Sequence, residues 1–269
     1  MSEVLVPVLI LGAMGLIFGV LLGVASKIFA VKTDERVPKI IEVLPGANCG
    51  GCGFAGCSAY ANALVGGGVK TNMCPVGGDA TSAKIAEILG VETETKEKKV
   101  ARVLCAGTPE LALQKYIFDG PSDCHSAARL GGGEKMCAHG CLGLGSCVKV
   151  CQFDAISVDS GVAVVDVEKC VACGACAAEC PKNVIKILPA KSKYTITCKS
   201  VEKGKLTRHD CKVGCIGCGI CAKACPKEAI TVTDNLAVID PTKCVNCGIC
   251  ATKCPQKAIN KVDDIMKVG

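Results

Sequence analysis

Regularly spaced cysteines constrain this chain more than any other feature. Residues 215–226 and 244–255 each contain the run Cys-x2-Cys-x2-Cys-x3-Cys-Pro. In proteins that bind two 4Fe-4S clusters, three cysteines of such a run bind one cluster and the fourth binds the other. The two runs therefore predict two clusters with crossed ligands. One predicted ligand set is Cys215, Cys218, Cys221 and Cys254, and the other is Cys225, Cys244, Cys247 and Cys250.

Structural zinc and disulfide bonds are the alternative uses of so many cysteines. Zinc sites usually combine Cys-x2-Cys pairs across a longer loop, often with histidine. A third cysteine at the same spacing and a fourth before proline fit a cluster better. Disulfides at this density belong to secreted chains. The motif therefore favours iron–sulfur clusters over both.

The same pattern occurs earlier in the chain, where nine cysteines coincide with later ones at one constant offset and without a gap. We call this distance, for example from Cys180 to Cys254, the repeat offset. The coincidence indicates an internal duplication. The earlier cysteines are Cys124, Cys137, Cys141, Cys147, Cys151, Cys170, Cys173, Cys176 and Cys180. Their counterparts are Cys198, Cys211, Cys215, Cys221, Cys225, Cys244, Cys247, Cys250 and Cys254. A β-hairpin is predicted in each copy, over residues 155–165 and 229–239.

The first copy lacks one ligand, because Leu144 stands where the second copy has Cys218. A normal cluster is still predicted from Cys151, Cys170, Cys173 and Cys176. Its companion retains Cys141, Cys147 and Cys180. We expect Cys137 to supply the fourth ligand, and a 3Fe-4S centre is the alternative.

Four cysteines remain outside these sets: Cys105, Cys124, Cys198 and Cys211. They could converge on a further cluster. In an alternative partition, one cluster has Cys105, Cys124, Cys137 and Cys141, and another has Cys147, Cys180, Cys198 and Cys211. Some of these cysteines could instead be free buried thiols. The spacing alone leaves these possibilities open.

A different motif precedes the repeats. Cys49, Cys52, Cys57 and Cys74 follow the spacing Cys-x2-Cys-x4-Cys-x16-Cys, with proline after the last. The intervening glycines permit a tight loop. We expect one more 4Fe-4S cluster here, with zinc as the alternative. The total is then five to six clusters, one of which could be 3Fe-4S.

The composition indicates a core that is partly inorganic. The 269 residues include 24 Cys but only three Tyr, five Phe and no Trp. Folding is therefore expected to depend on the metal. The formal charge is +6, but an oxidised cluster with four thiolates carries roughly −2, so six clusters would bring it to about −6.

Basic residues concentrate near the C-terminus. Residues 181–269 contain sixteen Lys and Arg against seven Asp and Glu. Nucleic acid is not the expected partner, because no aromatic residues are interleaved for stacking. An acidic redox partner such as ferredoxin fits better, since opposite charges would steer it.

Residues 4–26 form an uncharged run long enough to cross a bilayer as one helix. A cleaved signal peptide is the alternative, but no positive charge precedes the run. Lys27, Lys32, Arg36 and Lys39 follow it. The positive-inside rule then places the bulk of the chain in the cytoplasm, on the inner face of a bacterial cell membrane with one span.

The expected fold class is α+β, with a transmembrane helix, a small 4Fe-4S domain and duplicated two-cluster ferredoxin-like domains. The expected domains are a transmembrane anchor (1–30), a linker (31–45), a four-cysteine domain (46–90) and a second linker (91–104). A first cysteine-rich ferredoxin-like domain (105–190) and a second (191–269) follow. We find no catalytic constellation and expect no NAD or flavin site.

The ordered combination of membrane helix, Cys49–Cys74 motif and ferredoxin modules resembles the B-subunit family of the Rnf complex, and the resemblance covers the whole chain. It implies an electron-transfer subunit of an ion-translocating ferredoxin:NAD+ oxidoreductase that moves Na+ or H+. The implied partners are reduced ferredoxin and other membrane, flavin and NAD subunits. An anchored polyferredoxin that serves a hydrogenase or a redox-regulator reducing system is the second hypothesis, and a zinc-binding protein is the third.

Overall fold

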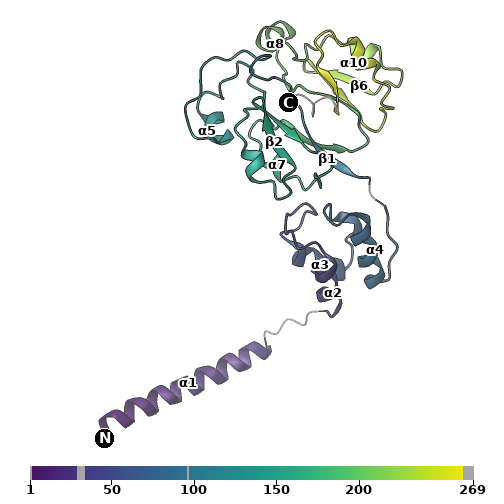
Figure 1. The fold of residues 1–269 in the computed structure, drawn as a ribbon. Coiled ribbons are helices and arrows are strands. Elements are labelled where there is room, and N and C mark those ends of the chain that lie inside the picture. The colour runs from purple at the N-terminus through teal and green to yellow at the C-terminus, as the bar shows by residue number, and fades with distance from the viewer. Residues whose placement is uncertain (1, 29–33, 96, 263–269) are drawn as a thin grey trace.

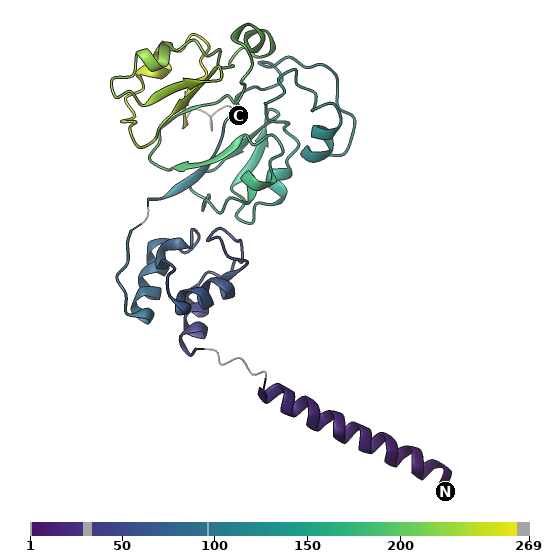
Figure 2. The ribbon, with the colours of Figure 1, turned by 180° about the vertical axis from the view of Figure 1, so that it is seen from behind.

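A long apolar helix begins the computed structural model, which describes residues 2–28, 34–95 and 97–262. Helix α1 (Ser2–Ile28) contains the segment Val8–Ile28, 21 residues with a mean hydropathy of 2.6. At a rise of about 1.5 Å per residue this segment spans about 30 Å, the thickness of a bilayer core. The helix stands apart from the rest of the chain (Figures 1 and 2). By length and composition α1 can cross a membrane. Lys32 lies outside the described residues.

The four-cysteine motif lies in a small helical unit between α1 and the rest of the chain (Figure 1). Ile40, Tyr60 and Ile85 form the centre of its core, at 1% exposure or less. The Tyr60 hydroxyl donates to the carbonyl of Lys70 at 2.8 Å and accepts from the N–H of Met73 at 3.3 Å. The elements are α2 (Arg36–Val43), α3 (Cys57–Gly66), the 3-10 helix η1 (Thr71–Met73) and α4 (Gly78–Leu89).

Two units with the same order of elements follow. The first contains α6 (Ser146–Lys149), β2 (Ile156–Asp159), β3 (Val162–Val165), α7 (Ala175–Glu179) and β4 (Ile185–Pro189). The second contains α9 (Ile220–Lys223), β6 (Ile230–Thr233), β7 (Leu236–Ile239), α10 (Ile249–Lys253) and β8 (Ile259–Lys261). Each element of the second unit begins one repeat offset after its counterpart. β2 and β3, like β6 and β7, pair as antiparallel hairpins.

Each unit also includes a strand from before its first cysteine run. β1 (Lys99–Val103) pairs antiparallel with β4, and Val103 lies opposite Ile185. β5 (Tyr194–Ile196) pairs in the same way with β8, and Ile196 lies opposite Ile259. The expected linker 91–104 thus ends in a strand whose last four residues are buried. Charged residues before β1 make the segment look like a linker in the sequence. The strand that pairs with it, β4, lies far downstream, beyond both cysteine runs of the first unit.

Cysteines are part of the core of both units. In the first unit, Cys141, Cys147 and Cys176 are buried together with Val100 and Ile156. The second unit buries Cys215, Cys221 and Cys250 with small aliphatic residues in the same way. Among the described residues, neither core contains a fully buried aromatic ring, so the sulfur-lined centres occupy space that larger side chains fill elsewhere. The sheets around them are two-stranded and antiparallel.

Removing the Tyr60 hydroxyl should loosen the helical unit. Tyr60→Phe leaves the N–H of Met73 and the carbonyl of Lys70 without this partner, which should cost about 1–3 kcal/mol. Faster hydrogen–deuterium exchange of the α3 and α4 amides is the expected result. Tyr116→Phe is the control, because the Tyr116 hydroxyl donates to the carbonyl of Leu130 at 2.7 Å from an exposed site. Unchanged exchange in Tyr60→Phe would contradict this role.

Candidate metal centres

The second unit brings its eight motif cysteines together as two groups of four. Each group lines its own cavity. Cys218 and Cys247 are exposed, whereas Cys221 and Cys250 are buried at the start of α9 and α10. The Cys215 group is Cys215, Cys218, Cys221 and Cys254. The Cys225 group is Cys225, Cys244, Cys247 and Cys250. The grouping is crossed, because each group takes three cysteines from one run and the fourth from the other.

The first unit forms one group with the expected members. Burial raises the pKa of Cys176 to about 11, and the nearby thiols of Cys170, Cys173 and Cys151 contribute to the rise. The N–H of Ala101 on β1 donates to the Cys170 sulfur at 3.3 Å. The Cys151 group is Cys151, Cys170, Cys173 and Cys176.

The other group in the first unit differs from expectation. Cys124 lines a cavity with the three retained cysteines, so the expectation that Cys137 completes this group is not met. Burial, together with the thiols of Cys141 and Cys124, raises the pKa of Cys147 to about 12. The Cys124 group is Cys124, Cys141, Cys147 and Cys180.

Hydrogen bonds explain how Cys124 reaches this position. It begins helix α5 (Cys124–Arg129), and its N–H donates to the Ser146 hydroxyl at 2.8 Å. The same hydroxyl donates to the carboxylate of Asp123 at 3.0 Å. Next to it, the Ser122 hydroxyl donates to the carbonyl of Leu144 at 3.2 Å. The segment before α5 is therefore fixed directly over the position where the first copy lacks its cysteine.

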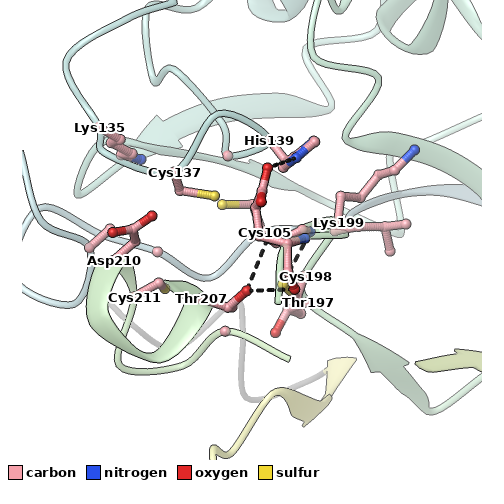
Figure 3. Close-up of a pocket in the computed structure, with 17 residues that line it drawn as sticks. Cys105, Lys135, Cys137, His139, Thr197, Cys198, Lys199, Thr207, Asp210 and Cys211 are labelled. Carbon is pink, nitrogen blue, oxygen red and sulfur yellow. Dashed lines mark hydrogen bonds and ion pairs between the residues drawn. The ribbon is translucent and has the colours of Figure 1, made fainter. Parts of the chain in front are cut away.

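The four remaining cysteines meet between the units. Cys105, Cys137, Cys198 and Cys211 line one cavity, and Figure 3 shows their side chains around the same space. We call them the shared group. Neither partition considered from the sequence matches this arrangement, because the first places Cys137 elsewhere and the second separates Cys105 from Cys198. Helix α8 (Gly204–Asp210) lies just before Cys211 and closes one side.

A recurring turn directs backbone N–H groups at the sulfur atoms. Asp154, Asn183, Glu228 and Lys257 stand three residues after the last cysteine of each run, and all have positive φ of 47–50°. The next N–H then points back toward the cysteine. Such donors reach Cys151, Cys225 and Cys254 from Ala155, Ala229 and Ala258 at 3.4, 3.4 and 3.3 Å. Hydrogen bonds of this kind stabilise thiolates and tune cluster potentials.

In the helical unit, Cys49 and Cys52 lie in one loop, Cys57 begins α3 and Cys74 directly follows η1. The Asn48 side chain accepts from the N–H of Cys57 at 2.8 Å, and the N–H of Gly77 donates to the Cys74 sulfur at 3.4 Å. Burial raises the pKa of Cys74, as do the thiols of Cys52 and Cys57. The Cys49 group is Cys49, Cys52, Cys57 and Cys74.

The loop of the Cys49 group touches the Cys151 group. A Cβ atom on Gly51 would lie 3.0 Å from Cα and 3.1 Å from the carbonyl oxygen of Cys173, and 2.8 Å from Pro75 Cγ. The thiol of Cys49 is close enough to raise the pKa of Cys173, whose main cause is burial. Gly51 therefore permits an approach that no other residue type allows.

All 24 cysteines lie in the described residues as free thiols without a disulfide. Among those residues, no three His, Cys, Asp or Glu side chains converge to hold a single metal ion. The cysteines of the Cys124, Cys215, Cys225 and shared groups instead line one cavity per group, and backbone donors reach sulfurs in several groups. This donor set fits a thiolate-bound cluster.

Three family profiles match the chain. The profile described as "Putative Fe-S cluster" matches residues 44–76, "4Fe-4S binding domain" matches residues 163–186, and "4Fe-4S dicluster domain" matches residues 214–258. The chain therefore contains ferredoxin-type 4Fe-4S domains.

Curated proteins are similar to most of the chain. The B subunit of the Na(+)-translocating ferredoxin:NAD(+) oxidoreductase complex of Acetobacterium woodii is 48% identical over 244 residues, covering 90% of this chain and 73% of that protein. The B subunit of the ion-translocating oxidoreductase complex of Methanosarcina acetivorans is 44% identical, covering 90% and 93%. The B subunit of the proton-translocating ferredoxin:NAD(+) oxidoreductase complex of Clostridium ljungdahlii is 41% identical, covering 89% and 85%.

Moving the thiol from position 124 to position 144 tests whether Cys124 is the fourth ligand of the Cys124 group. Cys124→Ala should remove iron from this group, because its fourth ligand is lost. The double variant Cys124→Ala/Leu144→Cys should regain it, since Leu144 occupies the position of Cys218 in the second unit. Iron and sulfide counts with EPR of the reduced protein measure both.

Leu144→Cys alone is the matched control and should keep the iron content of the unaltered protein. Full iron content in Cys124→Ala would show that Cys124 is not a ligand. Failure of the double variant to recover, with the other signals intact, would contradict the equivalence of the two positions.

Proposed function

Because the chain belongs to the B-subunit family of Rnf-type ion-translocating oxidoreductase complexes, we propose that it takes electrons from reduced ferredoxin and passes them to partner subunits. The chain is an iron–sulfur electron-transfer subunit, and other subunits of the complex are its partners. The complex couples ferredoxin oxidation and NAD+ reduction to Na+ or H+ translocation. The NAD and flavin sites belong to other subunits. The observation that carries this proposal is the series of contacts between cysteine groups.

Five cysteine groups are the proposed ligand sets. These are the Cys49, Cys124, Cys151, Cys215 and Cys225 groups. Each bound 4Fe-4S cluster would supply one-electron redox chemistry at low potential. The chain's own contribution is to hold four thiolates, to aim N–H donors at them and to limit water access.

We retain the expected division of the chain with one change. The anchor (1–30), linker (31–45) and four-cysteine domain (46–90) precede two duplicated two-cluster ferredoxin-like domains (105–190 and 191–269). β1 pairs with β4, so it belongs to the first ferredoxin-like domain rather than to the linker 91–104. The constant repeat offset between matching elements supports the duplication.

Contacts connect the groups within each unit and connect the first unit to the helical unit. The Cys225 and Cys215 groups share the core of the second unit, and cysteines of the Cys124 and Cys151 groups share that of the first. Burial is the main cause that raises the pKa of Cys147, and the thiol of Cys176 in the neighbouring group adds to the rise. Gly51 then brings the Cys49 group against the Cys151 group. The proposed order of electron transfer runs from the C-terminal unit through the first unit toward the membrane helix.

The second unit is the proposed docking site for ferredoxin. Its Cys218 and Cys247 are the two exposed cysteines, which brings this end within reach of a soluble partner. Exposed lysines, Lys223 and Lys227, flank Cys225. An acidic ferredoxin would be attracted and oriented by such charges.

Helix α1 is the proposed single membrane anchor. Lys27, Arg36 and Lys39 follow the uncharged run 4–26. This charge distribution supports a cytoplasmic location for the cysteine-rich units. The Cys49 group is the first after the anchor, which makes it the proposed donor to the membrane subunits.

Charge reversal tests the ferredoxin proposal. Lys223→Glu/Lys227→Glu should slow reduction of the anaerobically purified chain by reduced ferredoxin several-fold at low ionic strength. High salt should remove most of the difference, because exposed charges are then screened. Stopped-flow bleaching of the cluster absorbance measures the rate.

Lys84→Glu/Lys98→Glu is the matched control, since both lysines are exposed and lie outside the second unit. It should reduce at the original rate. Equal slowing by both variants would contradict docking at the second unit. If reduced ferredoxin bleaches no cluster in the unaltered chain, the proposed function is wrong.

Gly51→Ala tests the connection to the Cys49 group. The added methyl cannot be accommodated 3.0 Å from Cys173 Cα, so the two loops should separate. Weaker magnetic coupling between the two clusters in EPR, and slower reduction of the Cys49 cluster, are expected at unchanged iron content. Gly66→Ala in α3 is the control, because its Cβ would meet nothing within 4 Å. Unchanged coupling in Gly51→Ala would refute the contact.

A further inference from the structure

We propose that Cys105, Cys137, Cys198 and Cys211 hold one additional 4Fe-4S cluster, shared between the two ferredoxin-like units and connecting them. The inference rests on the proposed function. No matched family profile covers any of the four residues, since the matched ranges are 44–76, 163–186 and 214–258.

The strand pairings make Cys105 and Cys198 structural equivalents. Val103 opposes Ile185 at the end of β1, and Ile196 opposes Ile259 at the end of β5. Each cysteine stands two residues after its strand. Cys137 and Cys211 are equivalents by the repeat offset. Each unit therefore contributes the same pair of ligands to one site.

Backbone hydrogen bonds fix the two pairs against each other. The N–H of Ala106 donates to the carbonyl of Thr197 at 3.2 Å, which ties the loops that carry Cys105 and Cys198. Ala112 and Cys211 form an isolated antiparallel bridge. The N–H of Leu113 donates to the carbonyl of Asp210 at 2.9 Å. The four thiols are thus positioned by main-chain contacts between the units.

The cavity fits a thiolate-bound group. A Cβ on Gly107 would lie 3.5 Å from the Cys211 sulfur and 3.8 Å from that of Cys105, so Gly107 lies beside both sulfurs. The N–H of Ser200 donates to the Cys198 sulfur at 3.4 Å. Burial raises the pKa of Cys137, and the neighbouring Cys105 thiol adds to the rise.

A buried cation also borders the shared group. Lys135 is 4% exposed and lines the cavity. Its ammonium donates to the carbonyls of Cys141 and Gly161 at 2.8 and 3.0 Å, which are neutral acceptors. A buried charge is costly without a counter-charge. The carboxylate of Asp210, also buried, lines the same cavity, and four thiolates around an oxidised cluster would add a net charge of roughly −2.

The shared group contacts one cysteine group in each unit. The N–H of Cys141 donates to the Cys105 sulfur at 3.3 Å. A backbone hydrogen bond from Cys215 lowers the pKa of Cys198, against the larger effect of burial. Cys215 is the counterpart of Cys141 at the repeat offset, so the two contacts are equivalent. The shared group therefore completes the series between the Cys215 and Cys124 groups.

Counting iron in the full chain tests the proposal. The variants are Cys105→Ala/Cys137→Ala, Cys198→Ala/Cys211→Ala and the quadruple substitution, all purified without oxygen. At four irons per cluster, we expect about 24 iron atoms in the unaltered chain and about 20 in every variant. The three losses are equal because each variant empties the same site.

Three results would overturn the shared site. The first is a count of about 20 iron atoms in the unaltered chain, with or without one zinc. The second is undiminished iron in either double variant. The third is an iron loss in the quadruple variant that equals the sum of the losses in the two double variants. If the variants misfold, the count in the unaltered chain still decides, because the other five groups hold only about 20.

Ferredoxin reduction separates this proposal from the proposed function. In the double variants, reduced ferredoxin should still bleach the clusters of the second unit rapidly, while those of the first unit and the helical unit stay oxidised. Rapid reduction of all remaining clusters would refute the connecting role and leave the proposed function intact. Absence of any reduction in the unaltered chain would instead refute the proposed function.

Discussion

The fold of the cysteine-rich units depends on cysteine sulfurs that lie in groups of four beside backbone N–H donors. The left-handed residue three positions after Cys151, Cys225 and Cys254 turns the next N–H onto the sulfur. A thiolate in an apolar core is stable only with such donors and a bound cation or cluster. Short helices and two-stranded sheets suffice around these centres, because the sulfur groups occupy what would otherwise be the densest part of a hydrophobic core.

The two units have the same order of elements but differ in how one corner of a cysteine group is filled. The first unit has Leu144 in place of a cysteine, and a segment before α5 supplies Cys124 to the vacant corner. Cys105 and Cys137 lie farther apart in sequence than their equivalents Cys198 and Cys211, and Cys124 lies within the added length. The extra segment therefore brings a cysteine to the corner where Leu144 replaces one, while the pair that faces the other unit is kept.

The sequence predicts the parts of this architecture that are local. Within a run such as 215–226, three members of one group are neighbours along the chain, and the fourth takes the same place in the partner run, so the motif alone identifies them. The membrane-length helix and both hairpins are also evident from hydropathy and turn residues. The sequence does not reveal the β1–β4 pairing or the partners of Cys105, because these contacts join distant residues. The gap-free alignment was misleading at one position: it matched Cys124 to Cys198, whereas strand register makes Cys105 the equivalent. Only the fold shows where the insertion begins.

The interlocked position of Cys105, Cys137, Cys198 and Cys211 also bears on biogenesis. Units of a chain fold in the order in which they leave the ribosome, so the first unit emerges with Cys105 and Cys137 still waiting for their counterparts. The proposed shared site is complete only once translation has passed Cys211, which is after the last ligand of the first unit and before Cys254 of the second. The second unit would therefore have to dock on the first before its own two groups are complete.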